Sequence, residues 1–268
     1  MAKRKRASEE ARRPDAFQQG AGTAMKVIEK NFTLILGVCG GLLALGVALV
    51  AIDMVGKQNE QTAAATLFPT EKAYLEKKDQ FDRWDAWQRQ VKGLSKEELE
   101  KREKNKPKDM VERTGDLQKD YSAVVSGFEN VIATKSGTVA AKTAALYLSE
   151  IYRNYDKNAE AIAALQKVEK DLDGKNLIDA LVILELGSRQ ADAGNCDVAD
   201  STWLKIPEMD RLKFVRNEVT LRRAFCLRSK DPAQAASLLK DLSLDEAESA
   251  AGRSAKRYMR TLDANASR

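Results

Sequence analysis

Residues 32–52 form an apolar stretch, FTLILGVCGGLLALGVALVAI, that contains no charged side chain and no proline. A helix of this length spans roughly 30 Å, which is the thickness of the hydrocarbon core of a bilayer. Helices in the core of a soluble protein seldom stay apolar on every face for so long. The stretch therefore predicts one transmembrane helix, which we assign to residues 32–55.

Positive charge is concentrated before this stretch. Residues 1–31 contain eight Lys and Arg residues against four Asp and Glu residues, and their Pro14, Gly20 and Gly22 disfavour a continuous helix. Basic residues close to a span stay on the cytoplasmic side. We therefore expect a largely disordered cytoplasmic tail at residues 1–31 and an exported C-terminal domain, which is the topology of a single-pass protein of the bacterial inner membrane with a periplasmic domain.

A cleaved signal peptide is the alternative to a membrane anchor. Ala63 and Ala65 form an A-x-A pattern of the kind that a signal peptidase cuts. Signal peptides, however, have an apolar region of about 7 to 15 residues and a short basic leader. The apolar stretch here is longer, and so is its leader, which favours an anchor that stays attached.

The charge of the remaining chain argues against a nucleic-acid partner. The KRKR sequence at residues 3–6 resembles a basic DNA-binding arm, but residues 57–268 carry 37 basic and 35 acidic residues and are close to neutral. A basic tail beside a membrane span is more simply a topology signal.

The composition also argues against an enzyme. The chain contains no histidine, which removes the commonest general base and zinc ligand. We find no phosphate-binding loop, dinucleotide fingerprint, nucleophile elbow or C-x-x-C motif. The many carboxylates lie on helices rich in Lys and Glu, where they are typical of a solvated face. We expect no cofactor, no metal and no small-molecule substrate.

Small residues gather on one side of the predicted membrane helix. The spacing from Gly37 to Gly41 is that of a G-x-x-x-G motif, which lets two transmembrane helices approach closely. Glycine is also common in membrane spans that have no partner. The candidate contact residues for another transmembrane helix are Gly37, Gly40, Gly41, Ala44 and Ala48.

Residues 56–116 predict a long helix followed by a charged insertion. An apolar stripe at Phe81, Trp84, Trp87 and Val91 follows the helical period. Between Gly93 and Gly115 the chain becomes highly charged, and Ser95 followed by Glu98 forms a capping-box pattern for a short helix.

Residues 117–268 predict paired helices that repeat. Four segments begin with a small or aliphatic residue and have a larger apolar residue four positions later, and their starting points are separated by 37, 38 and 36 residues. A period in this range with paired helices indicates an α-solenoid, in which each pair buries its apolar face against its neighbours. The segments begin at Val124, Ala161, Ala199 and Ala235. The fold class we expect is all-α, with one N-terminal transmembrane helix and an array like that of tetratricopeptide-repeat (TPR) proteins.

The unit from Lys142 to Asp173 matches the tetratricopeptide pattern best, with Leu148 and Ser149 at its apolar and small positions. The third unit departs from it, because Arg222 and Arg223 stand at the equivalent positions, so we expect its first helix to be shifted. Residues 245–262 predict a closing helix with Ala247, Ala250, Ala251 and Tyr258 packed inward.

The concave face of such an array suits extended or helical peptides. On the tetratricopeptide register, the candidate peptide-binding residues are Leu146, Glu150, Arg153, Asn154, Leu184, Ser188, Thr220 and Arg228.

Two of the three cysteines lie in the predicted repeats. Cys196 begins a second helix, and Cys226 lies toward the end of the next unit's first helix. Antiparallel stacking brings these two helix ends together, and a periplasmic domain favours oxidation. A disulfide is therefore one possibility, and two separate buried thiols are the other.

The layout resembles the YfgM-type family, which is an ancillary subunit of the bacterial Sec translocon. The resemblance lies in TAALYLSEIYRNYDKNAEAIAALQKV at residues 143–168 and in KDPAQAASLLKDLSLDEAESAAGRSAKRYMRTLDA at residues 230–264. It implies an inner-membrane adaptor that binds translocon subunits, a periplasmic chaperone or exported clients. A scaffold for another envelope complex, in division, secretion or outer-membrane assembly, remains open because repeat folds do not determine partners. Formation of homo-oligomers also remains open.

Overall fold

The computed structural model describes the backbone of residues 32–107 and 109–266, and the side chains of residues 54–107 and 109–260. The chain divides into two units, residues 1–58 and residues 59–268. Among the residues with described side chains, we find no helix that is both long and apolar enough to cross a membrane. The predicted tail at 1–31 and the side chains of the predicted span up to residue 53 lie outside this range.

Every regular element in the described part of the chain is helical, which confirms the all-α prediction. The elements are α3 (Phe32–Val91), α4 (Lys96–Glu103), α5 (Leu117–Thr134), α6 (Val139–Asn154), α7 (Asn158–Glu169), α8 (Leu177–Asp192), α9 (Cys196–Trp203), the 3-10 helix η1 (Asp210–Leu212), α10 (Lys213–Leu227), α11 (Pro232–Asp245) and α12 (Ala250–Ala266).

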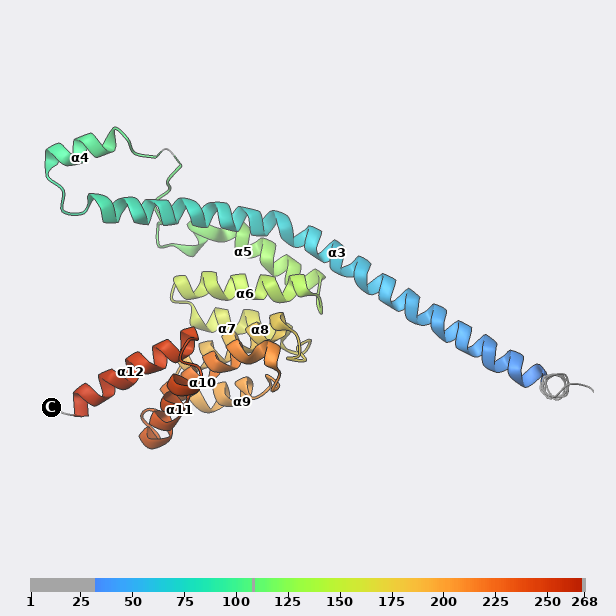
Figure 1. Ribbon diagram of the computed structural model, residues 1–268. Helices are drawn as coiled ribbons and strands as arrows, with labels where there is room; N and C mark the ends of the chain where they lie inside the picture. Colours follow the sequence, from blue (N-terminus) through green and yellow to red (C-terminus); the bar gives the residue numbers. More distant parts are fainter. Residues whose placement is uncertain (1–31, 108, 267–268) are drawn as a thin grey trace, which may run out of the picture. The chain divides into compact units, whose positions relative to one another are not determined.

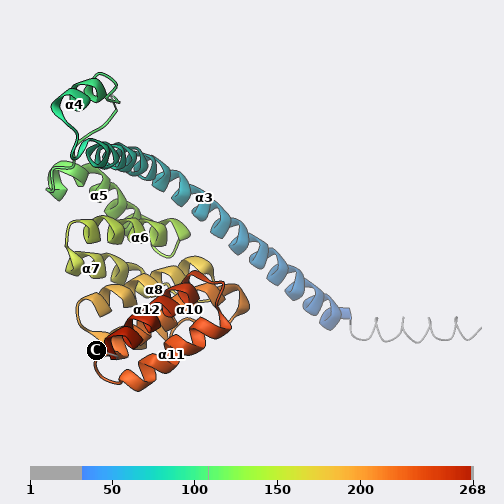
Figure 2. The same ribbon diagram turned by 60° about the vertical axis from the view of Figure 1, so that its left-hand side comes forward.

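The helices from α5 onward stack in successive layers (Figures 1 and 2). Helix α6 packs against α5, α7 and α8, while α10 packs against α8, α9 and α11, and α12 closes the stack against α10 and α11. Each layer thus buries its apolar side against the next, as a stacked helical array requires. The assignment of this array to the tetratricopeptide class stays a prediction.

The second part of α3 belongs to the same stack. The Tyr74 ring lies 5.8 Å from that of Tyr121 on α5 and 5.1 Å from that of Tyr147 on α6, measured between centroids. Tyr74 and Phe81 are buried in one core with residues of α5, α6, α7 and α8. Residues 59–91 therefore act as the first helix of a pair whose second helix is α5, and the charged insertion is the connection within that pair.

The insertion contains the short helix that its sequence predicts. Ser95 caps α4, and the backbone N–H of Ser95 in turn donates to the Glu98 carboxylate at 3.0 Å. This reciprocal arrangement satisfies two donors that the helix itself leaves unpaired. The capping-box prediction is confirmed.

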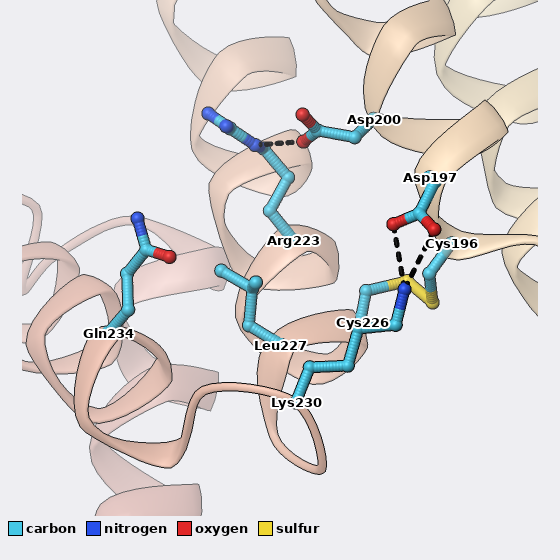
Figure 3. Close-up of a pocket in the computed structure, with 8 residues that line it drawn as sticks. All are labelled: Cys196, Asp197, Asp200, Arg223, Cys226, Leu227, Lys230 and Gln234. Atoms are coloured by element: carbon cyan, nitrogen blue, oxygen red, sulfur yellow. Dashed lines mark hydrogen bonds and ion pairs between the residues drawn. A yellow bond between two sulfur atoms is a disulfide. The ribbon is translucent and has the colours of Figure 1, made fainter.

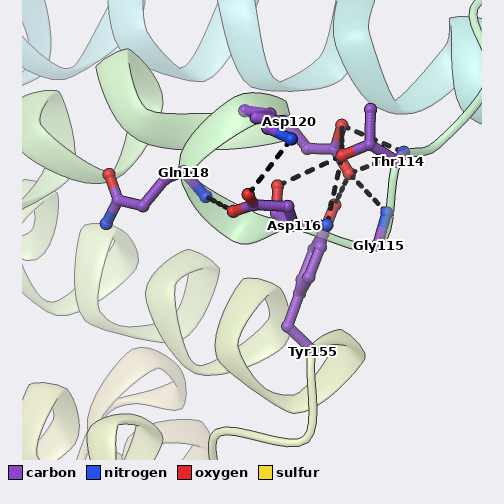
Figure 4. A network of polar contacts seen from close by, with 7 residues as sticks. Thr114, Gly115, Asp116, Gln118, Asp120 and Tyr155 are labelled. Atoms are coloured by element: carbon purple, nitrogen blue, oxygen red, sulfur yellow. Dashed lines mark hydrogen bonds and ion pairs between the residues drawn. The ribbon is translucent and has the colours of Figure 1, made fainter.

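A buried carboxylate fixes the end of the insertion (Figure 4). Asp120 on α5 accepts hydrogen bonds from the Thr114 backbone and hydroxyl, from the Gly115 backbone and, at 2.7 Å, from the Tyr155 hydroxyl. Burial by itself raises the pKa of Asp120, but the hydrogen bonds from Tyr155, Thr114 and Gly115 outweigh it and hold the pKa below its usual value. One ionised side chain thus ties the insertion to two helices.

The predicted repeat positions are buried. Val124, Ala161, Ala199 and Ala235 are all below a tenth exposed, as are the larger residues that follow each by four positions, Phe128, Leu165, Trp203 and Leu239. The prediction that these positions face the core is confirmed.

The register of α10 differs from that of the two earlier first helices. Arg222 and Arg223 are each about a third exposed and form ion pairs with Glu218 and Asp200. Ala224, one residue later, is the buried small residue at 1% exposure. The buried small residue thus lies one position later in α10 than the repeat pattern predicts, whereas the buried leucine of this helix, Leu221, precedes both arginines.

The closing helix begins later than the sequence predicts. Helix α11 continues to Asp245, and α12 starts at Ala250. Ala251 and Ala255 pack into the core, whereas Ala247 and Ala250 are exposed, so the expectation that these two pack inward is wrong. Tyr258 is 43% exposed, although its ring contacts Phe225 at a centroid distance of 4.4 Å.

Candidate functional site

A disulfide joins the α8–α9 pair to the α10–α11 pair. Cys196 is the first residue of α9 and Cys226 lies near the end of α10, and their sulfur atoms are bonded across a Cα–Cα distance of 5.6 Å. The antiparallel stacking inferred from the sequence brings these two helix ends together, and the bridged alternative is the one found.

Two ion pairs flank the bridge (Figure 3). Lys230, just after α10, lies 2.7 Å from the Asp197 carboxylate, and Arg223 pairs with Asp200 one helical turn further along α9. These residues line a hollow of about 340 Å³ between α9, α10 and the start of α11. Its cations and carboxylates pair with each other, so this hollow offers little unpaired charge to a ligand.

A second hollow, which Arg223 also lines, is called here the α9–α10 cleft. It has a volume of about 410 Å³ and is bordered by the end of α9, by residues 204–208 and by α10. The buried side chains of Trp203, Ile206 and Val219 form its apolar lining, and Leu204 at its edge is 66% exposed. An aromatic and aliphatic lining beside an exposed leucine suits an apolar side chain of a partner.

The rim of the α9–α10 cleft is polar. Arg216, Thr220 and Arg223 lie at i, i+4 and i+7 on α10, so they share one face of that helix. Arg223 is paired with Asp200, whereas the described residues provide no ion-pair partner for Arg216 or for Glu208, which also lines the cleft. The rim therefore presents one unpaired cation and one unpaired anion beside the apolar lining.

Packing around Trp203 fixes the position of the cleft. The indole Nε1 of Trp203 donates to the Leu184 carbonyl at 3.1 Å, and the ring lies directly against Gly187 on α8, where a Cβ would overlap it. Gly174 adopts φ +69, and a Cβ there would come within 2.6 Å of the Lys205 carbonyl oxygen. Because these two positions are glycine, α9 and the segment after it can pack closely against α8 and the turn before it.

The predicted concave-face residues of α8 and α10 differ in accessibility. Ser188 is 1% exposed and its hydroxyl donates to the Leu184 carbonyl, so its side chain is not open to a partner in this structure. Leu184 is partly buried against the core that α8, α9 and α10 share. Thr220 lines the α9–α10 cleft, and Arg228 is exposed just beyond α10.

The predicted residues on α6 lie beside α3. The Glu150 carboxylate pairs with Lys78 at 2.7 Å, and Leu146 packs against the first core. Arg153 and Asn154, at the end of α6, are exposed. Of the eight candidates, the structure therefore places only Thr220 in the α9–α10 cleft.

The predicted transmembrane contact residues are Gly37, Gly40, Gly41, Ala44 and Ala48. Their backbone forms part of α3, but their side chains lie outside the described residues. That prediction remains open.

Burial raises the pKa of several tyrosines, Tyr74 and Tyr155 among them, and none of these tyrosines lines the α9–α10 cleft. Burial, with neighbouring carboxylates, raises the pKa of Tyr147 to about 12, and burial also raises the pKa of Tyr121 to about 12. Within the described residues, no three Cys, Asp or Glu side chains gather as a metal site requires. The chemistry that the α9–α10 cleft offers is binding through an apolar lining and a polar rim.

The sequence reasoning missed Leu204 and Arg216. Neither residue occupies a position of the repeat pattern, which in this unit uses Ala199, Trp203 and Ile206. A signal was present in the sequence, because Leu204 is a large apolar residue directly after the repeat residue Trp203 and has no aliphatic or aromatic residue three or four positions away on either side.

Comparisons with protein-family models, with curated proteins and with solved structures gave no match for this chain.

Proposed function

We propose that this chain is a membrane-tethered periplasmic adaptor that binds other proteins, at the Sec translocon and together with a periplasmic chaperone. The tether is the apolar stretch at residues 32–52, and the binding part is the stack of helices from residue 59 onward. The α9–α10 cleft is the docking place for an extended segment of a protein partner.

The observation that carries the proposal is the exposed Leu204 at the edge of a cleft lined by Trp203, Ile206 and Val219. Protein interfaces are centred on apolar and aromatic pockets that exclude water, with polar groups around them. The cleft has this composition. It also lies between two helix pairs, which is where a stacked array leaves a groove for a partner chain.

The Cys196–Cys226 bridge supports the compartment. Disulfides persist in oxidising compartments such as the bacterial periplasm and are rare in the cytosol. The basic tail before the apolar stretch supports the same topology, because it favours a cytoplasmic N-terminus.

Photocrosslinking in intact cells tests the proposal. A photoreactive amino acid is placed at Leu204 in the full chain, and the trapped proteins are identified by mass spectrometry. The matched control is the same amino acid at Leu244 on α11, since both leucines are 66% exposed and Leu244 lies outside the cleft.

We expect translocon subunits, a periplasmic chaperone or exported clients to be captured from position 204 and not from position 244. The substitution Leu204→Asp in an otherwise native chain should reduce their copurification from solubilised membranes, whereas Leu244→Asp should not. Equal capture of these proteins from positions 204 and 244 would show that the α9–α10 cleft is not their docking place. Capture of a division, secretion or outer-membrane assembly complex alone would overturn the assignment to the translocon.

A further inference from the structure

Four cations lie on one side of α12, and we call them the α12 basic stripe. Arg253, Lys256, Arg257 and Arg260 occupy positions i, i+3, i+4 and i+7, so they fall within about 100° of the helix circumference and along about 10 Å of its length. All four are exposed. Between Glu248 and Asp263 the sequence contains no Asp or Glu.

The stripe is not neutralised by the described part of the chain. Arg253 donates to the Glu248 carbonyl and Arg257 to the Ser254 hydroxyl, but none of the four cations has a carboxylate partner among the described residues. Exposed cations on α3, by contrast, have carboxylate partners. Lys72 pairs with Glu76, and Arg83 pairs with Asp79, each at i, i+4 spacing. Residues 57–268 are close to neutral as a whole, so the stripe is a local concentration of charge.

Apolar side chains of α12 pack against α11. Ala251 and Ala255 are buried with Leu239 and Leu242 of α11, and Met259 packs against the same core. Helices that lie on a bilayer bind by inserting an apolar face below the headgroups. Among the described side chains of α12, residues 250–260, Tyr258 is the only large apolar side chain that is exposed, which disfavours a membrane surface as the partner.

We propose that the α12 basic stripe binds an acidic segment of a partner protein. Three of the four cations are arginines, whose planar guanidinium groups bind carboxylates through two parallel hydrogen bonds. Side chains on one face of an extended peptide repeat about every 7 Å, so a stripe of about 10 Å meets two or three carboxylates of an Asp- or Glu-rich segment. This surface is separate from the α9–α10 cleft and does not depend on it.

A hexaglutamate peptide tests the proposal. The full chain is purified in a non-ionic detergent, and binding of the fluorescently labelled peptide is followed by anisotropy. We expect saturable binding that weakens as ionic strength rises to about 0.15 M, because exposed charges are screened. In the variant Arg257→Gln/Arg260→Gln the dissociation constant should rise about fivefold, the loss expected for two exposed ion pairs.

The matched control is Arg89→Gln/Arg102→Gln, which removes the same charge from two exposed arginines outside α12. This control should change the dissociation constant by less than about twofold. Unchanged unfolding midpoints show that both variants remain folded. Absence of binding, or an equal loss in the two variants, would overturn the proposal.

A membrane partner is distinguished in a second arm. The full chain is placed in nanodiscs of zwitterionic or anionic phospholipid, and hydrogen exchange of α12 is compared. Protection of α12 only in anionic nanodiscs, together with failure of hexaglutamate to bind, would assign the stripe to the bilayer instead. Crosslinking from Leu204 tests the α9–α10 cleft and does not depend on α12. Failure of this inference and failure of the proposed adaptor function can therefore be told apart.

Discussion

The Lys142 ammonium lies 2.7 Å from the Asp179 carboxylate in a buried ion pair that joins α6 to α8. The side chains of Lys142 and Asp179 are 8% and 1% exposed. Asp179 also accepts the Asp173 backbone N–H at 2.9 Å. Burial by itself raises the pKa of Asp179, but these contacts with Lys142 and Asp173 outweigh it and lower the pKa. The pair thus fixes how two successive helix pairs stack.

Removing one partner of this pair should destabilise the fold strongly. We expect Lys142→Met to lower the free energy of unfolding by about 3 kcal/mol, because an uncompensated carboxylate is left in the interior. Urea unfolding of the full chain in detergent, followed by circular dichroism, measures the change. The control is Lys167→Met, since Lys167 and Glu129 form an exposed pair at 3.9 Å and its loss should cost less than about 1 kcal/mol. Similar losses in both variants would contradict a special role for the buried pair.

The Asp120 network should make stability depend on acid pH. The folded-state pKa of Asp120 lies below the ordinary value of 3.8, so its ionised form stabilises the fold above that pH. This contribution is lost as the pH falls from about 4 through the folded-state pKa. Asp120→Asn should therefore cost about 1 to 3 kcal/mol at neutral pH and progressively less below pH 4. Unfolding midpoints across this range check the trend, and a constant difference at all pH values would rule out ionisation of Asp120 as its cause.

The bond between Cys196 and Cys226 should stabilise the folded state, and reduction of this bond should remove the stabilisation. A bridge between residues separated by 30 positions contributes about 3.6 kcal/mol in the chain-entropy model. The variant Cys196→Ser/Cys226→Ser should unfold at a lower urea concentration than the oxidised chain. Adding a reductant should abolish the difference between their urea midpoints. Two reactive thiols in the untreated native chain would show that the bridge is not formed.

Gly187 should not tolerate a side chain. A Cβ at this position would overlap the Trp203 indole, so Gly187→Ala must displace Trp203 and should destabilise the fold by about 2 kcal/mol. It should also weaken crosslinking from Leu204, the residue next to Trp203. Gly56→Ala provides the comparison, because nothing lies within 4 Å of that Cβ and alanine is the better helix former. Equal stability of the two variants would contradict the close packing at Gly187.

Local sequence signals determine the starts of two helices. Asp231 caps α11, whose first residue is Pro232, and Ser95 with Glu98 caps α4. These ends follow from the sequence because a cap satisfies backbone groups within one turn of its own position. The buried repeat positions also follow, since the same apolar spacing recurs in each pair and each pair must bury it.

The tertiary structure decided the features that depend on contacts between distant segments. Residues 59–91 form the first helix of a pair with α5, because Tyr74 and Phe81 meet Tyr121 across the whole insertion. The sequence of neither segment reveals the other as its partner. The burial of Leu221 and Ala224 on either side of two exposed arginines and the cleft beside Trp203 likewise arise from how α10 and α11 pack on α8 and α9. The fit between side chains of different helices determines that arrangement.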